Sequence, residues 1–250
     1  MNLSTLFSQG ALKGRRAVVT GATAGIGKSI ARELARAGAS VVITGRDEQL
    51  LQVAAGELNV DGFAFDVADA EAVAACAEKV GHIDILVNNA GIDQHGYFLH
   101  TDESEWRRLV DVNLFGTLYM VRSFLPGMHK RGFGRIINIA SEAGRKGSRG
   151  GSVYAATKGG VIAFTKSIAQ ESARYGVTAN VVCPGPIKTP LLEKAVSEGG
   201  KKLLDAMTAS TLFGRLGSPE EVSGLVTYLA TDNAAFITGE VIGVSGGMGL

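Results

Sequence analysis

The chain alternates short apolar runs with longer stretches in which apolar residues recur at helical spacing. The runs are rich in valine and isoleucine and occupy residues 17–20, 41–44, 63–65, 83–87, 136–139, 177–182 and 241–244. Because most of them are continuously apolar, we expect strands that are buried on both faces. The pattern predicts an α/β fold in three layers, with a doubly wound parallel sheet of the Rossmann type, helices on both faces and right-handed crossovers.

Three long helices are predicted from their apolar spacing and end signals, at residues 26–37, 104–128 and 153–175. Gly116 and Pro126 lie inside the second helix and are expected to bend or end it. Residues 189–213 have a weaker helical pattern with polar runs, and we interpret them as a mobile helical flap beside the substrate.

The alternation continues from about residue 15 to the end without a linker, repeat or low-complexity segment. We therefore expect a single domain over residues 1–250, with residues 1–12 as an N-terminal extension. In an open parallel sheet, ligands bind beyond the carboxyl ends of the strands. The residues that follow the apolar runs are thus the candidates for a site.

Composition and charge narrow the possible classes of protein. Hydrophobic residues make up 46% of the chain and charged residues 20%, which is typical of a soluble globular protein. With 25 basic and 24 acidic residues, no overall field favours nucleic acid or an anionic membrane. The cysteines and histidines lack metal-ligand spacing, and neither a signal peptide nor about eighteen continuous apolar residues is present. These features predict a cytoplasmic protein without a metal site.

A glycine-rich turn follows the first apolar run. Residues 20–27 read TGATAGIG and place Gly21, Gly25 and Gly27 where the first helix begins. Glycines let the backbone approach a pyrophosphate, and a helix N-terminus offers it free N–H groups and a positive dipole end. The turn predicts a dinucleotide site, although a plain strand-to-helix turn would have similar residues.

The end of the second run bears on the choice of dinucleotide. Gly45 stands where an NAD site usually has a carboxylate for the ribose, and Arg46 follows it. An arginine can bind the extra phosphate of NADP, so NADP(H) is favoured. NAD(H) stays open, because Asp47 could face the ribose and Arg46 could be a solvated loop charge.

Tyr154 and Lys158 lie four residues apart, which places a phenol and an ammonium on one face of a helix. A tyrosine needs a lowered pKa to act as acid and base near neutral pH, and a neighbouring cation favours the phenolate. Ser141 follows the run 136–139 and could hydrogen-bond the same substrate oxygen. Asn113 is either a polar residue that faces solvent or caps a helix or, if buried, the holder of a water in a proton path.

Together these motifs resemble the short-chain dehydrogenase/reductase family, in the branch of about this chain length. The resemblance rests on residues 20–27, 66–67, 88–91 and 184–189, and on Asn113, Ser141, Tyr154 and Lys158. It implies a sheet of seven parallel strands, a catalytic tetrad formed by those four residues, and a homotetramer. A departure weakens the NADP prediction: many NADP-dependent members carry a basic residue inside the glycine turn, where this chain has Thr23 and Ala24.

The resemblance also implies further contacts with the cofactor. Asp66 and Val67 would contact adenine, residues 88–91 would back the dinucleotide, and Ile187 and Thr189 would touch the carboxamide. The predicted cofactor-binding residues are Gly21, Thr23, Gly25, Ile26, Gly27, Arg46, Asp66, Val67, Asn88, Ala90, Gly91, Tyr154, Lys158, Pro184, Gly185, Ile187 and Thr189.

Residues 106–184 are similar to dehydrogenases of cyclic hydroxyacyl-CoA esters and to 3-oxoacyl-carrier-protein reductases. Asp93, His95, Glu142 and Arg145 are candidate substrate contacts, with Gln94, Lys146 and Arg149 near them. The basic residues could bind a thioester phosphate or a carboxylate, or could simply belong to a solvated loop. The main hypothesis is an NAD(P)-dependent oxidoreductase that interconverts a secondary alcohol and a ketone; the alternative is a catalytically idle dinucleotide-binding sensor or scaffold.

Overall fold

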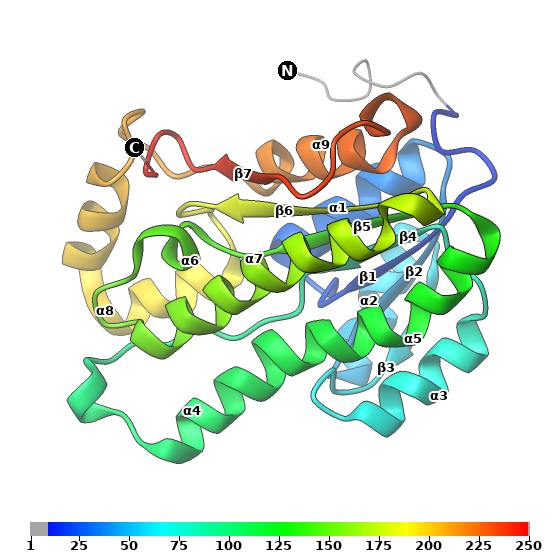
Figure 1. The fold of residues 1–250 in the computed structure, drawn as a ribbon. Coiled ribbons are helices and arrows are strands. Elements are labelled where there is room, and N and C mark those ends of the chain that lie inside the picture. Colours follow the sequence, from blue (N-terminus) through cyan, green and yellow to red (C-terminus); the bar gives the residue numbers. More distant parts are fainter. Residues whose placement is uncertain (1–9, 250) are drawn as a thin grey trace.

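The computed structural model describes residues 10–249, so residues 1–9 of the predicted extension lie outside the described part (Figure 1). A seven-stranded sheet has the order β3-β2-β1-β4-β5-β6-β7, and all its pairings are parallel. The strands are β1 (Arg16–Thr20), β2 (Ser40–Gly45), β3 (Asp61–Ala64), β4 (Ile85–Asn88), β5 (Gly134–Ile139), β6 (Val177–Pro184) and β7 (Val241–Val244). The predicted doubly wound Rossmann-type fold is confirmed, and its strand order reverses between β1 and β4.

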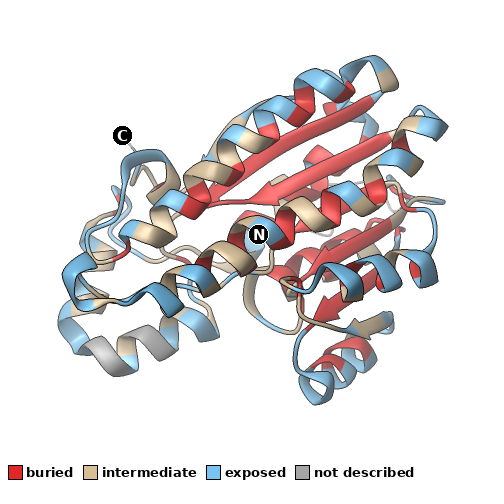
Figure 2. Ribbon diagram, turned by 60° about the horizontal axis from the view of Figure 1, so that its bottom comes forward, coloured by how far each residue is buried: buried red, intermediate tan, exposed pale blue. Residues whose placement is uncertain are grey.

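Helices cover both faces of the sheet (Figure 1). One core joins the strands to α1 (Gly25–Arg36), α2 (Glu48–Leu58) and α9 (Pro219–Ala230), and the other joins them to α3 (Ala70–Val80), α5 (Gly116–Arg131) and α7 (Ser152–Ser172). Neighbouring residues of a strand point to opposite faces of the sheet: Val19 packs in the first core and Val18 in the second. Both are fully buried, which explains why the apolar runs are continuous (Figure 2).

The helix predicted at residues 104–128 is interrupted. It consists of α4 (Glu103–Val110), a π-helical turn η3 (Asp111–Phe115) and α5, which runs on to Arg131. Gly116 begins α5, and Pro126 does not end it. Pro126 and Arg122 are both exposed, so water can replace the backbone hydrogen bond that proline removes.

The remaining elements are short or lie beside the site. They are η2 (Phe98–His100), α6 (Glu142–Lys146), η4 (Ala173–Tyr175), α8 (Pro190–Ala209) and η5 (Asp232–Ala234). The helix predicted within residues 189–213 is thus present as α8, with a kink where Gly200 adopts a φ of 71°. That α8 moves as a flap stays a prediction.

A network of hydrogen bonds that caps the start of α9 makes the stability of the fold depend on pH. Glu221 accepts hydrogen bonds from the Ser218 N–H at 2.8 Å and from both terminal nitrogens of Arg215 at 2.7 and 2.8 Å. The Arg215 hydrogen bonds, followed by the Ser218 hydrogen bond, lower the pKa of Glu221 from 4.5 to about 2. A lowered carboxyl pKa means that the stabilisation is complete above the unfolded-state pKa and is lost as the pH falls through the folded-state value.

Glu221→Gln should therefore lower the free energy of unfolding at pH 7 by about 1 kcal/mol, a modest figure because the pair is partly exposed and screened. The difference from the unmodified protein should shrink by about half between pH 7 and pH 3, as measured by urea unfolding at both values. A difference that stays constant over this interval would show that Glu221 stabilises the fold by packing and not by charge.

Candidate active site

Loops at the carboxyl ends of β1, β4, β5 and β6 enclose a cavity of about 470 Å³. It lies at the reversal of strand order, where a dinucleotide was predicted. The predicted site residues that line it are Gly21, Thr23, Gly25, Ile26, Gly27, Ala90, Gly91, Asp93, Ser141, Glu142, Tyr154, Lys158, Pro184, Gly185, Ile187 and Thr189. Those that do not line it are Arg46, Asp66, Val67, Asn88, His95, Asn113 and Arg145.

The glycine turn is held against the loop that follows β4. A Cβ atom on Gly21, whose φ is +63°, would lie 2.7 Å from the Cα of Ala90, and one on Gly27 would lie 2.5 Å from the Asn89 amide nitrogen. Asn89 fixes this approach, because its side chain donates hydrogen bonds to the carbonyls of Thr20 and Gly21. Glycine is thus required at both positions, and backbone forms this wall of the cavity.

The N-terminus of α1 faces the cavity without a side-chain cap. Its N-cap residue is Ala24, and its first turn contains no acidic residue. The N–H groups of that turn therefore lack side-chain partners, and the positive end of the helix dipole is not neutralised locally. An anionic pyrophosphate would satisfy both, so the residues present fit the phosphates of a dinucleotide.

At the end of β2, Gly45 occupies the position where NAD-binding proteins usually have a carboxylate that binds the ribose. A Cβ atom on Gly45 would lie 2.6 Å from the Thr23 methyl group, so a larger residue does not fit there. Asp47 instead caps α2 by accepting a hydrogen bond from the N–H of Leu50 at 2.9 Å. Arg46 between them is exposed.

Asp66 is held in place by a residue that the sequence did not single out. Its carboxylate accepts a hydrogen bond from the Ala68 N–H at 3.0 Å and one from Arg108 of α4 at 2.5 Å. Burial alone would raise the pKa of Asp66, but these two hydrogen bonds hold it below its ordinary value. Val67 is buried against Gly116 at the start of α5. Asn88 lies inside β4 and donates a hydrogen bond to Asn138, so Asn89 and not Asn88 contacts the glycine turn.

The four predicted catalytic residues come together at the ends of β4 and β5. Ser141 and Tyr154 both line the cavity, and the side chain of Ser141 is close enough to the phenol to act on its pKa. Lys158 Nζ lies 5.7 Å from the centre of the Tyr154 ring and donates a hydrogen bond to the Ile139 carbonyl at 3.0 Å. A Cβ atom on Gly91 would meet Asn113 Oδ1 at 3.1 Å and Lys158 Nζ at 3.4 Å, so these two side chains flank the same backbone.

The pKa of Tyr154 is raised in this structure, whereas the sequence predicted that Lys158, together with the positive charge of an oxidised nicotinamide, would lower it. Burial of the phenol is the main cause, the charge of Asp93 adds to it, and only the hydrogen bond with Ser141 opposes it. Lys158 is itself buried, and this burial lowers its pKa to about 8. Desolvation is thus the dominant effect on the phenol, and it disfavours the phenolate in this structure.

Asn113 lies in the π-helical turn and is almost completely buried, which excludes a position in solvent. Its Oδ1 accepts a hydrogen bond from the Ile92 N–H, and its Nδ2 donates to the Ile92 carbonyl and to Thr157 Oγ1. Because both N–H donors of the amide are engaged and Oδ1 accepts one hydrogen bond, only the second lone pair of Oδ1 is left on this side chain to hold a water. The side chain also anchors the loop after β4 to α7.

The candidate substrate residues separate into two groups. Asp93 lines the cavity and pairs with the exposed His95 at 3.7 Å. Glu142 is buried and pairs with Arg145 at 2.9 Å, and Arg145 borders a second cavity on the other side of residues 186–187. Arg149 lies over the Tyr97 ring at 5.5 Å, so of the three basic residues only Lys146 reaches the main cavity.

Gln94 caps the helix that carries Tyr154. Its Oε1 accepts hydrogen bonds from the N–H groups of Val153 and Tyr154 at 2.9 and 3.0 Å, while the N-cap residue Gly151 has no side chain to do so. Gln94 is buried in the loop after β4. It therefore fixes the backbone of Tyr154 relative to the dinucleotide side of the cavity.

Gln94→Leu should lower the free energy of unfolding by about 1 kcal/mol and reduce kcat more than it changes KM, because two helix N–H groups lose their acceptor. Thermal unfolding and steady-state kinetics would measure both effects. Gln94→Glu keeps the acceptor oxygens and should restore most of kcat. If the leucine variant matches the unmodified protein in kcat, Gln94 does not position Tyr154.

Among residues 10–249, no group of three or more histidine, cysteine, aspartate or glutamate side chains could hold a metal ion. In the same part of the chain, no helix is both long and apolar enough to cross a membrane.

Fold and site together place the protein among the dinucleotide-dependent oxidoreductases. The family model described as enoyl-(acyl carrier protein) reductase matches residues 21–249. The chain belongs to the short-chain dehydrogenase/reductase family. Its homologues are reductases and dehydrogenases, so the chain is an oxidoreductase that acts on a secondary alcohol or ketone, and not an idle dinucleotide-binding protein.

Three relatives illustrate the range. The 3-oxoacyl-[acyl-carrier-protein] reductase of Vibrio cholerae is 42% identical over 243 residues, covering 95% of this chain and 98% of its own. The 2-keto-3-deoxy-L-fuconate dehydrogenase of Xanthomonas campestris is 40% identical over 241 residues, with 94% and 80% coverage. A solved actinorhodin polyketide ketoreductase with NADPH has a TM-score of 0.88 and 37% identity, with 94% and 97% coverage.

Proposed function

We propose that the protein is an NADP(H)-dependent ketone reductase and alcohol dehydrogenase in which Tyr154 transfers the proton. The observation that carries this proposal is that Tyr154, Ser141 and Lys158 line one cavity with the uncapped N-terminus of α1. The two hydroxyl groups converge where a substrate oxygen would sit, and the cation of Lys158 stands beside them.

When bound, the nicotinamide dinucleotide supplies or accepts the hydride. Tyr154 gives its proton to the carbonyl oxygen during reduction, and burial, which raises the pKa of the phenol, favours the protonated form that donates. Ser141 donates a hydrogen bond to the same oxygen. Lys158, anchored on the Ile139 carbonyl, stabilises the phenolate that remains after the transfer.

The geometry at the end of β2 supports NADP(H) over NAD(H). The packing of Gly45 against Thr23 excludes a carboxylate at that position, and Asp47 is engaged as a helix cap. Lys28 is paired with Glu57 at 2.5 Å, which leaves the exposed Arg46 as the cation offered to a 2′-phosphate.

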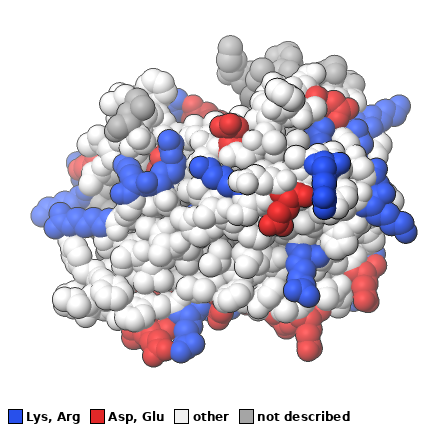
Figure 3. Space-filling view, viewed as in Figure 1, with Lys and Arg blue, Asp and Glu red and all other residues white. Residues whose placement is uncertain are grey.

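We further propose that the protein acts in the cytoplasm as a homotetramer on a small molecule, with no nucleic-acid or membrane partner. The resemblance to the family implies the tetramer. In support of it, the middle of the face over α7 and α5 carries few charged side chains (Figure 3), and Phe115 at the end of η3 is 41% exposed. A nearly balanced net charge of +1 gives nucleic acid no electrostatic attraction.

A panel of cyclic ketones, 3-oxoacyl thioesters and sugar ketones, assayed through nicotinamide absorbance with NADPH, tests the proposal. We expect turnover of at least one class, dependent on NADPH. Binding of NADPH without turnover of any ketone, or of the matching alcohols with NADP⁺, would support a sensor or scaffold instead.

A further inference from the structure

The C-terminal tail, defined as residues 245–249, folds back over α6 after leaving β7 (Figure 1). The Met248 N–H donates a hydrogen bond to the Ser245 carbonyl at 3.2 Å, which closes a turn. The Met248 carbonyl then accepts a hydrogen bond from Lys146 Nζ at 2.8 Å. The tail is thus tied to the short helix that follows the catalytic Ser141.

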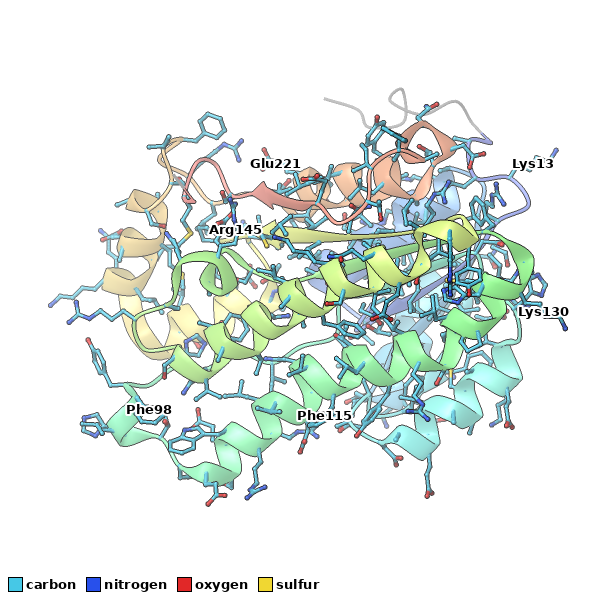
Figure 4. The ribbon with its side chains drawn as sticks, viewed as in Figure 1. Lys13, Phe98, Phe115, Lys130, Arg145 and Glu221 are labelled. Carbon is cyan, nitrogen blue, oxygen red and sulfur yellow. The ribbon has the colours of Figure 1, made fainter. Side chains whose placement is uncertain are left out.

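The tail is also wedged between two parts of the site. A Cβ atom on Gly249 would lie 2.5 Å from a carboxylate oxygen of Glu142, the buried neighbour of Ser141. Arg145 pairs with that carboxylate and lies between α6 and the end of β7 (Figure 4). On the other side the Leu212 N–H, just beyond α8, donates a hydrogen bond to the Gly246 carbonyl at 2.8 Å. The tail therefore bridges α6 and the segment that follows α8.

This bridge brings Met248 into the same cavity as Tyr154. The apolar side chains that line this cavity with it include Ala143 of α6, and Leu191, Leu192 and Met207 of α8. Polar side chains also line this cavity: Lys146 bonds the tail carbonyl, Asp93 accepts a hydrogen bond from the Gln94 N–H, and Ser148 lies in the same lining. The apolar part of the lining offers hydrocarbon and thioether groups to a substrate beyond the reacting oxygen.

We infer that Met248 of the tail, together with Met207, forms the wall that selects the substrate, and that it favours ketones with a bulky aliphatic or alicyclic group over polyhydroxylated ones. Methionine side chains are unbranched and adapt to irregular apolar shapes. A hydroxylated group would leave its polar atoms unpaired against this wall. This inference rests on the proposed function, since it assigns the substrate end of the same site.

The test compares cyclohexanone, the larger 2-decalone and the polyhydroxylated fructose, with NADPH and the full-length chain. The unmodified protein should reduce the cyclic ketones and leave fructose nearly unused. Met248→Ala should raise the ratio of kcat/KM for 2-decalone to that for cyclohexanone by about tenfold, and Met248→Phe should lower it. Lys146→Met, which frees the tail and keeps an apolar stem, should move the ratio in the same direction as Met248→Ala. Phe236→Ala, which alters a fully exposed side chain away from the cavity, should leave it unchanged.

The outcomes separate the two proposals. If the unmodified protein turns over no ketone, the proposed function fails. If it is active but the ratio stays the same in both Met248 variants, or if fructose is the better substrate, the tail does not select the substrate although the reaction class stands. The dissociation constant for NADPH should be unchanged in all variants, which shows that each is folded.

Discussion

Replacing Tyr154 with phenylalanine should lower kcat for ketone reduction by about 10³-fold while leaving the dissociation constant for NADPH within about twofold. The substitution removes only the hydroxyl group, which lines the cavity beside Ser141. The ring stays buried, and the carbonyl anchor of Lys158 does not depend on the phenol. Steady-state kinetics and titration of NADPH fluorescence would measure the two quantities.

Tyr228→Phe is the matched control, because this tyrosine is 37% exposed on α9 and does not line the cavity. It should leave kcat unchanged. Turnover by the Tyr154 variant at the unmodified rate would remove the assigned proton donor, whereas loss of NADPH binding would show that the substitution damaged the cavity.

Arg46→Ala should raise the dissociation constant of NADPH by about 30-fold and that of NADH by less than about twofold. A charge-assisted hydrogen bond to a phosphate is worth about 1.5–3 kcal/mol, and only NADPH has the 2′-phosphate. We expect this preference for NADPH over NADH because Arg46 is exposed next to the ribose site. Gly45 packs against Thr23 there, which leaves no room for a carboxylate at that position.

Lys28→Ala provides the comparison, since Lys28 also lies near the glycine turn but is paired with Glu57. Its removal should weaken NADPH and NADH equally and slightly. Equal losses of both dinucleotides in the Arg46 variant would instead indicate that Arg46 contributes a general positive field and that the protein does not prefer NADP(H).

The sheet could be predicted from the sequence because a strand that is buried on both faces is a continuous run of apolar residues. Each predicted run overlaps a strand, and the bounds differ by a few residues at most; β6, for example, extends from the predicted 177–182 to Pro184. The glycine turn and the pair Tyr154 and Lys158 were equally visible, because their chemistry depends on neighbours within one turn of chain.

The π-helical interruption at residues 111–115 has no comparable pattern in the sequence. A π-helical turn keeps near-helical backbone angles, and Val110 and Gly116 on either side are both in the right-handed helical region. Its partners are distant: Asn113 bonds residues 21 and 44 positions away. The bonds of Gln94 to α7 and of Lys146 to the tail span 59 and 102 positions. Contacts of this kind become apparent only when the chain is folded.

The depth at which Tyr154 is buried could not be predicted from the sequence for a related reason, and the lowering of its pKa by Lys158 and an oxidised nicotinamide stays a prediction. Sequence spacing places Lys158 near the phenol, and this part of the prediction is correct. It does not show how deeply both groups are buried, and burial determines the direction of their pKa values. Arg145 was likewise assigned to the substrate, but its partner Glu142 holds it toward the second cavity.

Transfer of a labelled hydride tests the central claim most directly. NADPH deuterated at C4 of the nicotinamide, on each face in turn, is incubated with the best ketone of the panel, and the product alcohol is analysed by mass spectrometry. We predict that one of the two labels appears on the carbinol carbon, adding one mass unit, and that this incorporation is lost with Tyr154→Phe. An alcohol product that carries neither label would contradict the account.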